Sequence, residues 1–154
     1  MLRGRESILG NNSSILLDTS FLLPTLGIDV EDDVYRALEL LKKTNLFYLE
    51  AGLLEALWVA IRFSEKIPLK TIEEGIEAIR RDYILIHPSG KSFADALMIY
   101  KLGHRDFIDA LHYTTALNHN IKLLTIDKQF INFLKQNNYK LEGIVLTPKD
   151  LLHK

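Results

Sequence analysis

The sequence predicts an α/β fold in which helices cover both faces of a parallel sheet. Short apolar segments alternate with longer amphipathic segments along the whole chain. Strands that alternate with helices in this way form parallel sheets through right-handed crossovers. Residues 15–17 (ILL) and 83–86 (YILI) are apolar on both faces, which is typical of strands that helices cover on both sides. We therefore expect a three-layer α/β/α sandwich.

The individual elements follow from the apolar spacing and from turn residues. Five strands are expected, at residues 15–17, 46–49, 83–86, 121–124 and within 141–146. Helices are expected at residues 29–43, 51–65, 71–81, 92–102, 107–118 and 128–136, with a short one from Pro148. Pro68 marks the break after the second helix, and Gly103 is a typical stop for the fourth.

Length and composition are those of one globular domain. The chain has 154 residues, of which 47% are hydrophobic and 25% are charged, and such a chain can bury a substantial core. We interpret residues 1–154 as a single domain in which residues 1–14 form a polar N-terminal extension. No apolar segment is long enough for a membrane span or a signal peptide, so we expect a cytoplasmic protein without membrane contact.

The polar composition limits the kinds of site that the chain can build. The absence of cysteine excludes disulfides and thiolate metal ligands. The formal net charge of −1, from 19 Lys and Arg against 20 Asp and Glu, argues against a strongly basic nucleic-acid-binding surface. It is compatible with an enzyme that contacts a few phosphates. A metal held by oxygen ligands would be Mg²⁺ or Mn²⁺.

Four acidic residues stand at positions that a parallel sheet can bring to one edge. Asp18 directly follows the first strand, and Asp127 comes shortly after the fourth. Glu55 lies about one turn into the helix after the second strand, and Asp109 lies in the first turn of the helix before the fourth. Ligands bind beyond the carboxyl ends of such strands, and converging carboxylates need protons or cations between them. One or two Mg²⁺ or Mn²⁺ ions there could activate a water and stabilise the leaving oxygen of a phosphodiester.

Each of these acids also has a purely structural interpretation. Asp18 could cap a turn after the strand, and Asp127 could be the N-cap of the helix 128–136, since Asp is a favoured N-cap residue. Asp109 could complement the positive end of its helix dipole. Glu55 could be an ordinary solvated side chain. The placement of all four at one end of the sheet favours a functional site.

Four segments resemble, in order, the motif regions of PIN domains, a family that includes the toxins of VapBC-type toxin–antitoxin pairs. The segments are ILLDTSFLL, LLEALWVAIR, FIDALHYTTAL and LLTIDKQF, and the resemblance runs from about Ile15 to the C-terminus. The matching residues are Asp18 with Thr19 and Ser20, Glu55, Asp109, and Thr125, Asp127 and Phe130 in a Thr-x-Asp-x-x-Phe pattern. All four motifs occur in the right order with the expected element between each.

The resemblance implies a fold, an activity and partners. The implied sheet has the strand order 3-2-1-4-5, and the implied activity is Mg²⁺- or Mn²⁺-dependent cleavage of RNA by a metal-activated water. Asp18, Glu55, Asp109 and Asp127 would be both the catalytic residues and the metal ligands. An inactive PIN fold that binds RNA or serves as a scaffold is the alternative. The toxin relatives further imply a homodimer and an antitoxin that places an Arg or Lys against the carboxylates.

Other polar residues near these motifs have secondary roles in this interpretation. Thr19, Ser20, Thr125 and Asp106 would support the acids, with Asp106 preferred as the N-cap of its helix. Arg105 and Lys128 are candidates for phosphate contacts. Glu50 ends the second strand in this reading and ranks below Glu55. His112 is expected to be a packing or hydrogen-bonded residue rather than a base.

Apolar residues on two predicted helices suggest a surface for association. Within residues 71–101 they are Ile72, Ile76, Ile79, Phe93, Leu97 and Ile99. Because a domain of this size can cover its sheet with fewer helices, we expect part of this surface to form a homodimer interface. Trp58 is expected in the core or in such an interface.

Overall fold

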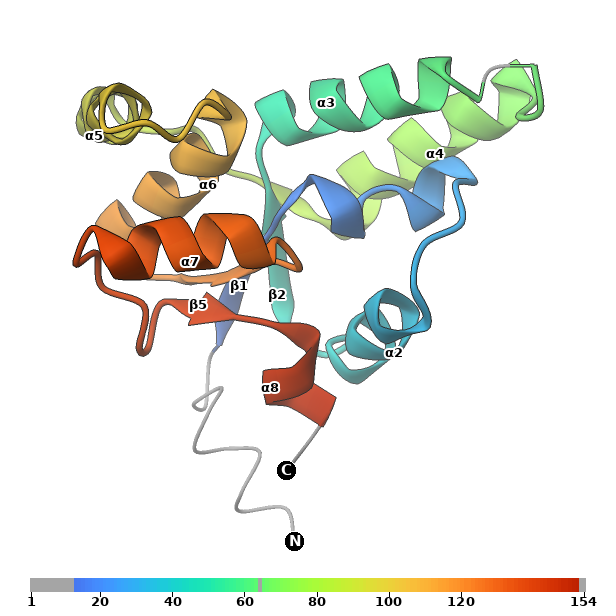
Figure 1. Ribbon diagram of the computed structural model, residues 1–154. Coiled ribbons are helices and arrows are strands. Elements are labelled where there is room, and N and C mark those ends of the chain that lie inside the picture. Colours follow the sequence, from blue (N-terminus) through green and yellow to red (C-terminus); the bar gives the residue numbers. More distant parts are fainter. Residues whose placement is uncertain (1–12, 64, 153–154) are drawn as a thin grey trace, which may run out of the picture.

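The computed structural model, which describes residues 13–63 and 65–152, contains the expected parallel sheet (Figure 1). Five strands lie in the order β3-β2-β1-β4-β5. They are β1 (Ser14–Leu17), β2 (Asn45–Tyr48), β3 (Ile84–Leu85), β4 (Lys122–Leu124) and β5 (Val145–Leu146). The strand order implied by the resemblance is confirmed. The direction of winding therefore reverses between β1 and β4, where Leu17 pairs with Leu124.

Seven α-helices and two short 3₁₀ helices connect the strands in the described part of the chain. The 3₁₀ helices are η1 (Thr19–Phe21) and η2 (Pro24–Leu26). The α-helices are α2 (Asp32–Leu40), α3 (Glu50–Ile61), α4 (Leu69–Asp82), α5 (Gly90–Lys101), α6 (Phe107–Asn118), α7 (Lys128–Gln136) and α8 (Pro148–Leu152). Figure 1 shows α5, α6 and α7 on one side of the sheet and α2 and α4 on the other.

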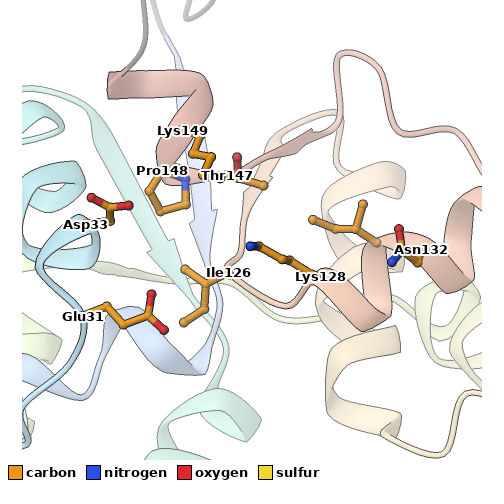
Figure 2. Close-up of a pocket in the computed structure, with 9 residues that line it drawn as sticks. Glu31, Asp33, Ile126, Lys128, Asn132, Thr147, Pro148 and Lys149 are labelled. Atoms are coloured by element: carbon orange, nitrogen blue, oxygen red, sulfur yellow. The ribbon is translucent and has the colours of Figure 1, made fainter.

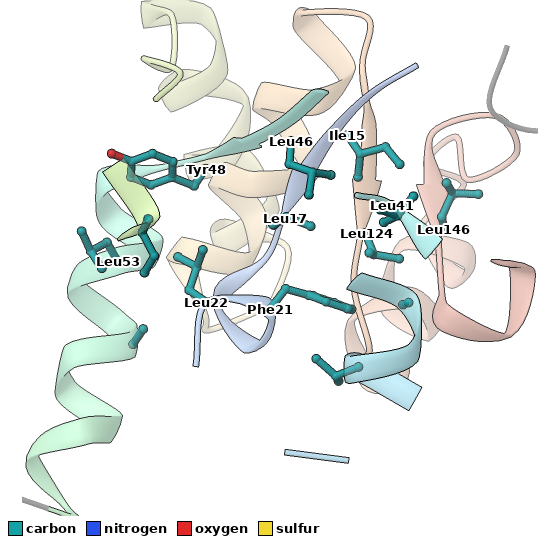
Figure 3. Packing of buried hydrophobic residues seen from close by; sticks show 14 of the residues in the cluster. Ile15, Leu17, Phe21, Leu22, Leu41, Leu46, Tyr48, Leu53, Leu124 and Leu146 are labelled. Atoms are coloured by element: carbon teal, nitrogen blue, oxygen red, sulfur yellow. The ribbon is translucent and has the colours of Figure 1, made fainter. Parts of the chain in front are cut away.

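Each face of the sheet packs against its own hydrophobic cluster, because successive residues of a strand point to opposite faces. Ile15 and Leu17 are buried in a cluster with residues of α2, α3, α4 and α8, part of which is seen in Figure 3. Leu16, between them, is buried in a second cluster with residues of α5, α6 and α7. The predicted three-layer sandwich is therefore confirmed.

The segment after β1 differs from the prediction, which placed no element there. Asp18 accepts a hydrogen bond from the Ser20 N–H at 3.0 Å, and this contact turns the chain into η1 as soon as the strand ends. The helix predicted at residues 29–43 is the shorter α2. Val30 has the right spacing for a helix but packs against the core from the extended segment before it.

Two further expectations change with the observed boundaries. Glu50 does not end β2: it is the first residue of α3, and its Oε1 lies 2.8 Å from Nη2 of Arg80 on α4. The predicted N-terminal extension falls largely on residues 1–12, which lie outside the described residues. Ser14, its last residue, belongs to β1.

Helix α3 leaves a row of apolar side chains on the surface. Leu54, Trp58 and Ile61 are 53%, 67% and 58% exposed, so Trp58 is not a core residue. Two of the positions predicted as an association surface, Ile79 and Ile99, are instead fully buried. Among the described residues, none of the helices has the length and apolarity needed to cross a bilayer.

Candidate functional site

The carboxyl edge of the sheet holds Asp18 where β1 ends. The Asp18 N–H donates to the Leu124 carbonyl at 3.1 Å, so the residue stands beside the last residue of β4. Its side chain is only 8% exposed. The pKa of Asp18 is raised to about 7, mainly by burial, which outweighs the lowering effect of hydrogen bonds from Thr125 and Ser20, and the charges of Asp127 and Glu55 contribute to the rise. A half-protonated carboxyl at neutral pH is a group that a cation would ionise fully.

Asp127 serves as a helix cap and also adds charge to this edge. Its carboxylate accepts from the Phe130 N–H at 3.0 Å, which makes it the N-cap of α7. Its own N–H donates to Oγ1 of Thr125 at 3.1 Å. Its charge raises the pKa of both Asp18 and Asp109. The structural interpretation of Asp127 is thus correct, and it does not remove the residue from the acidic cluster.

The tightest group of acids joins two helices. Glu55 of α3, Asp106 and Asp109 each offer a carboxylate oxygen, and these oxygens lie within 4.8 Å of one another. Asp106 is the N-cap of α6, since it accepts from the Asp109 N–H at 3.1 Å. The cap geometry folds its carboxyl over the first turn of the helix, onto the side where Glu55 lies. Asp106 was expected to cap, and the structure adds it to the group that could hold a metal ion.

Asp109 is coupled electrostatically to three other acids. Its pKa is raised to about 9, first by burial and then by the charges of Asp106, Asp127 and Asp18. Burial also raises the pKa of Glu55, with a further contribution from Asp106. The charges of the four acids predicted from the sequence and of Asp106 therefore influence one another, while the group whose oxygens lie within 4.8 Å of one another consists of Glu55, Asp106 and Asp109.

His104 lies in this site, and sequence reasoning missed it. Its Nε2 is 3.1 Å from Oδ2 of Asp109, and the side chain is only 15% exposed. The imidazole stacks on Phe130 at 4.5 Å between ring centroids and also touches Phe133. Stacking on these two rings of α7 holds the imidazole of His104, which in turn fixes one carboxylate oxygen of Asp109 relative to α7. The one signal in the sequence is the position of His104 in the loop just before the cap of α6.

A glycine allows α3 to approach α6 closely enough to bring Glu55 to Asp109. A Cβ added at Gly52 would lie 2.9 Å from Nε2 of His112, a distance that real Cβ atoms essentially never show. His112 is buried, its Nδ1 contacts the Ile108 carbonyl at 2.9 Å, and burial lowers its pKa to about 4. The expectation that His112 packs and hydrogen-bonds is confirmed.

Two hydroxyl residues stand beside the acids. Thr19 is 8% exposed, and its Oγ1 makes no hydrogen bond of good geometry to any residue that the structure describes. It is still close enough to the Glu55 carboxylate to lower the pKa of that group. Thr125 is buried and accepts from the Asp127 N–H. Thr19 in particular keeps an unused polar atom next to the acidic cluster.

The two cationic candidates are both exposed at the margin of the site. Arg105 precedes Asp106, and its guanidinium carbon lies 4.7 Å above the centre of the Tyr100 ring. Lys128 is the first residue of α7, directly after Asp127. Each is directly adjacent in the sequence to an acid of the cluster.

Comparison with known protein families assigns this fold. The family model of the PIN domain matches residues 15–134, which includes every acid described above. The chain belongs to the PIN domain family. No curated protein sequence matches it significantly.

Solved structures agree with this assignment to the PIN domain. The chain resembles a toxin–antitoxin complex from Klebsiella pneumoniae with a TM-score of 0.62 and 18% identity, over 87% of this chain and 97% of that one. It resembles VapBC2 from Rickettsia felis, bound to a DNA fragment from their promoter, with a TM-score of 0.60 and 19% identity, over 87% and 98%. PAE2754 from Pyrobaculum aerophilum gives a TM-score of 0.63 at 13% identity, over 92% and 93%. At these identities the likeness establishes the PIN fold.

Proposed function

We propose that this PIN domain is a divalent-metal-dependent endoribonuclease in which Asp18, Glu55, Asp109 and Asp127 hold Mg²⁺ or Mn²⁺. The observation that carries the proposal is the group of Glu55, Asp106 and Asp109, whose carboxylate oxygens lie within 4.8 Å of one another, beside Asp18 and Asp127, whose charges raise the pKa of Asp109. These acids come from four separate segments, and their mutual influence has an electrostatic cost. An arrangement of side chains that is electrostatically unfavourable in this way is typical of functional sites.

The donor set fits a hard divalent cation. Glu55, Asp106 and Asp109 offer oxygens within 4.8 Å of one another, and oxygen is the ligand that Mg²⁺ and Mn²⁺ prefer. Burial, followed by the charges of the neighbouring acids, raises the pKa of Asp18 and Asp109, so a bound cation would favour the ionised carboxylates that this site otherwise disfavours. The unused hydroxyl of Thr19 gives the cluster another oxygen.

The chain's own residues would prepare the site for phosphodiester hydrolysis. A bound divalent ion would supply Lewis-acid activation of the attacking water and stabilisation of the leaving oxygen. Asp127 is fixed by its cap on α7, and Asp109 is held at one oxygen by His104. Lys128 and Arg105 would orient the phosphates of the strand, with their charges at the margin of the acidic cluster.

The toxin role of this enzyme is the second part of the proposal. Two of the similar structures are described as a toxin–antitoxin complex and as a VapBC2 complex. By analogy, an antitoxin would inhibit this chain by placing an Arg or Lys among the five acids, because that charge can replace the cation. The inactive alternative, an RNA-binding or scaffold module, gives no reason for the acids to converge.

We also infer that the protein is a homodimer through α3. Leu54, Trp58 and Ile61 are spaced four and three residues apart, so they share one face of the helix, and all three are more than half exposed. A contiguous apolar row on a helix of a water-soluble fold is typical of an interface. A second copy of the same helix would match it by two-fold symmetry.

Cleavage of a labelled single-stranded RNA tests the activity. We expect cleavage with Mg²⁺ or Mn²⁺ and none with chelator. Because water rather than the neighbouring 2′-hydroxyl would attack, a strand with a 2′-deoxy sugar at the cleaved position should still be cut. Cleavage that persists in chelator and leaves cyclic phosphate ends would contradict the proposal.

A further inference from the structure

A pocket lies at the same edge of the sheet, on the other side of the start of α7 from the helices α3 and α6. Its volume is about 380 Å³, within the range of small-molecule sites. Residues from α2, α7, α8 and the ends of β4 and β5 line it. They are Glu31, Asp33, Ile126, Lys128, Ile131, Asn132, Thr147, Pro148 and Lys149. Figure 2 shows Lys128 reaching from α7 toward Ile126 and Pro148, with Glu31 on the opposite wall.

The charged groups of this pocket are largely free to meet a ligand. Asp33 is close to Arg36, with 3.7 Å between carboxylate oxygen and guanidinium nitrogen. Lys128, Lys149 and Glu31 form no ion pair with any residue in the described ranges, although they line one pocket. Two lysines and two acids, Glu31 and Asp33, therefore line the same space.

The remaining lining combines apolar side chains with one amide. Ile126, Ile131 and Pro148 provide an apolar wall, and Asn132 offers an amide that can both donate and accept. A planar base can pack on such a wall, while its polar edge meets the amide and the carboxylate. The two lysines can meet the attached phosphate. These are the complementary parts of one nucleotide.

The pocket is connected to the acidic cluster through a single residue. Asp127 lies between Ile126 and Lys128 in the sequence, and both neighbours line the pocket. Consecutive Cα atoms are about 3.8 Å apart, so the rim of the pocket is within roughly one nucleotide step of the cluster. A strand with its reacting phosphate at the acids would reach the pocket with an adjacent nucleotide.

We propose that this pocket is a nucleotide subsite that receives one nucleotide of the RNA strand next to the cleaved bond. The subsite rests on the proposed ribonuclease function and deepens it. The base packs on Ile126 and Ile131, and its phosphate lies between Lys128 and Lys149. Because the Glu31 carboxylate can only accept hydrogen bonds, bases with an exocyclic amino group are preferred, and cytosine is favoured over uracil.

Titration of the metal-free protein with cytidine 5′-monophosphate tests the subsite without any need for cleavage. Amide NMR signals of Ile131, Asn132 and Thr147 should shift at millimolar nucleotide. Lys149→Gln should weaken this binding about fivefold, as expected for one lost charged contact. Lys135→Gln is the matched control, since it removes the same charge from the far end of α7. It should leave binding unchanged.

Base preference gives the second arm of the test. Cytidine monophosphate should bind more tightly than uridine monophosphate, and Glu31→Gln should remove the difference. Shifts confined to the pocket in a protein that cleaves no RNA would support the subsite and contradict the nuclease proposal. Normal RNA cleavage with an unchanged KM in Lys149→Gln would overturn the subsite alone. Failure of both nucleotides to shift these signals, or shifts with an acidic peptide only, would also overturn it.

Discussion

Replacement of Asp109 by Asn should stabilise the protein when no metal is present. The pKa of Asp109 is about 9 in the folded protein against an ordinary value of 3.8, so the folded chain keeps a proton at pH 7 that the unfolded chain releases. Keeping it costs about 1.4 kcal/mol for each pH unit between the ordinary value and pH 7, or roughly 4 kcal/mol. Solvent screening of a side chain that is 18% exposed lowers this to about 2–3 kcal/mol.

Thermal unfolding in chelator measures this effect. At pH 7 the melting temperature of Asp109→Asn should exceed that of the wild type by roughly 5–10 °C. Because the folded wild type binds the extra proton, its stability relative to the variant is highest below about pH 4 and falls as the pH rises toward 9. The gain in melting temperature should therefore increase with pH.

A second acid provides a control with the opposite sign. Lys91 and Asn118 lower the pKa of Asp95, so Asp95→Asn should lose a little stability in the same experiment. An Asp109→Asn protein that melts below the wild type in chelator would refute the reasoning. A gain that does not change with pH would refute it as well, because the gain would then have another origin.

Substitutions at three further positions test the packing, the metal site and the dimer. Gly52→Ala should destabilise the protein by about 1–3 kcal/mol, because the new Cβ would meet the buried His112 ring at 2.9 Å; an unchanged urea midpoint would contradict the close approach of α3 and α6. His104→Phe keeps an aromatic ring but loses the nitrogen beside Asp109, so calorimetry should show Mn²⁺ affinity about tenfold lower at an unchanged melting temperature, with smaller losses for His104→Gln. If His104→Phe and His104→Gln bound Mn²⁺ with equal affinity, His104 would be a packing residue only. Trp58→Glu should convert the dimer into a monomer by light scattering, and a monomeric wild type at micromolar concentration would remove the dimer.

The topology and four of the acids could be predicted from the sequence because both depend on order along the chain. Alternating strands and helices require a parallel sheet, and Asp18 directly follows one of its strands. Asp127 comes after another. Once β1 and β4 are neighbours, these two residues reach the same edge regardless of how the helices pack.

The remaining members of the site depend on helix rotation and loop geometry, which spacing does not encode. Asp106 looks like an ordinary cap in the sequence, and its proximity to Glu55 follows from the contact between α3 and α6 at Gly52. His104 lies in a loop without any ligand spacing, and its position depends on stacking against Phe130. Neither contact leaves a periodic signal.

The predicted starting points of α2 and α3 are wrong for a related reason. Apolar spacing reports burial, and a residue can be buried from an extended segment as well as from a helix. Val30 is such a residue, since it packs against the core before α2 begins. The sequence pattern predicts Glu50 at the end of a strand, whereas it begins α3 and pairs with Arg80, which is thirty residues away and therefore outside any local pattern.

The most direct test of the central claim is RNA cleavage by Asp18→Asn beside the wild type and Asp95→Asn. All three proteins are assayed with Mn²⁺ and with chelator on one labelled strand. The wild type and Asp95→Asn should cleave at similar rates with Mn²⁺ and not at all with chelator, while Asp18→Asn should be slower by about a hundredfold or more. Cleavage by Asp18→Asn at the rate of the wild type would contradict the assignment of the acidic cluster as a metal-dependent nuclease site.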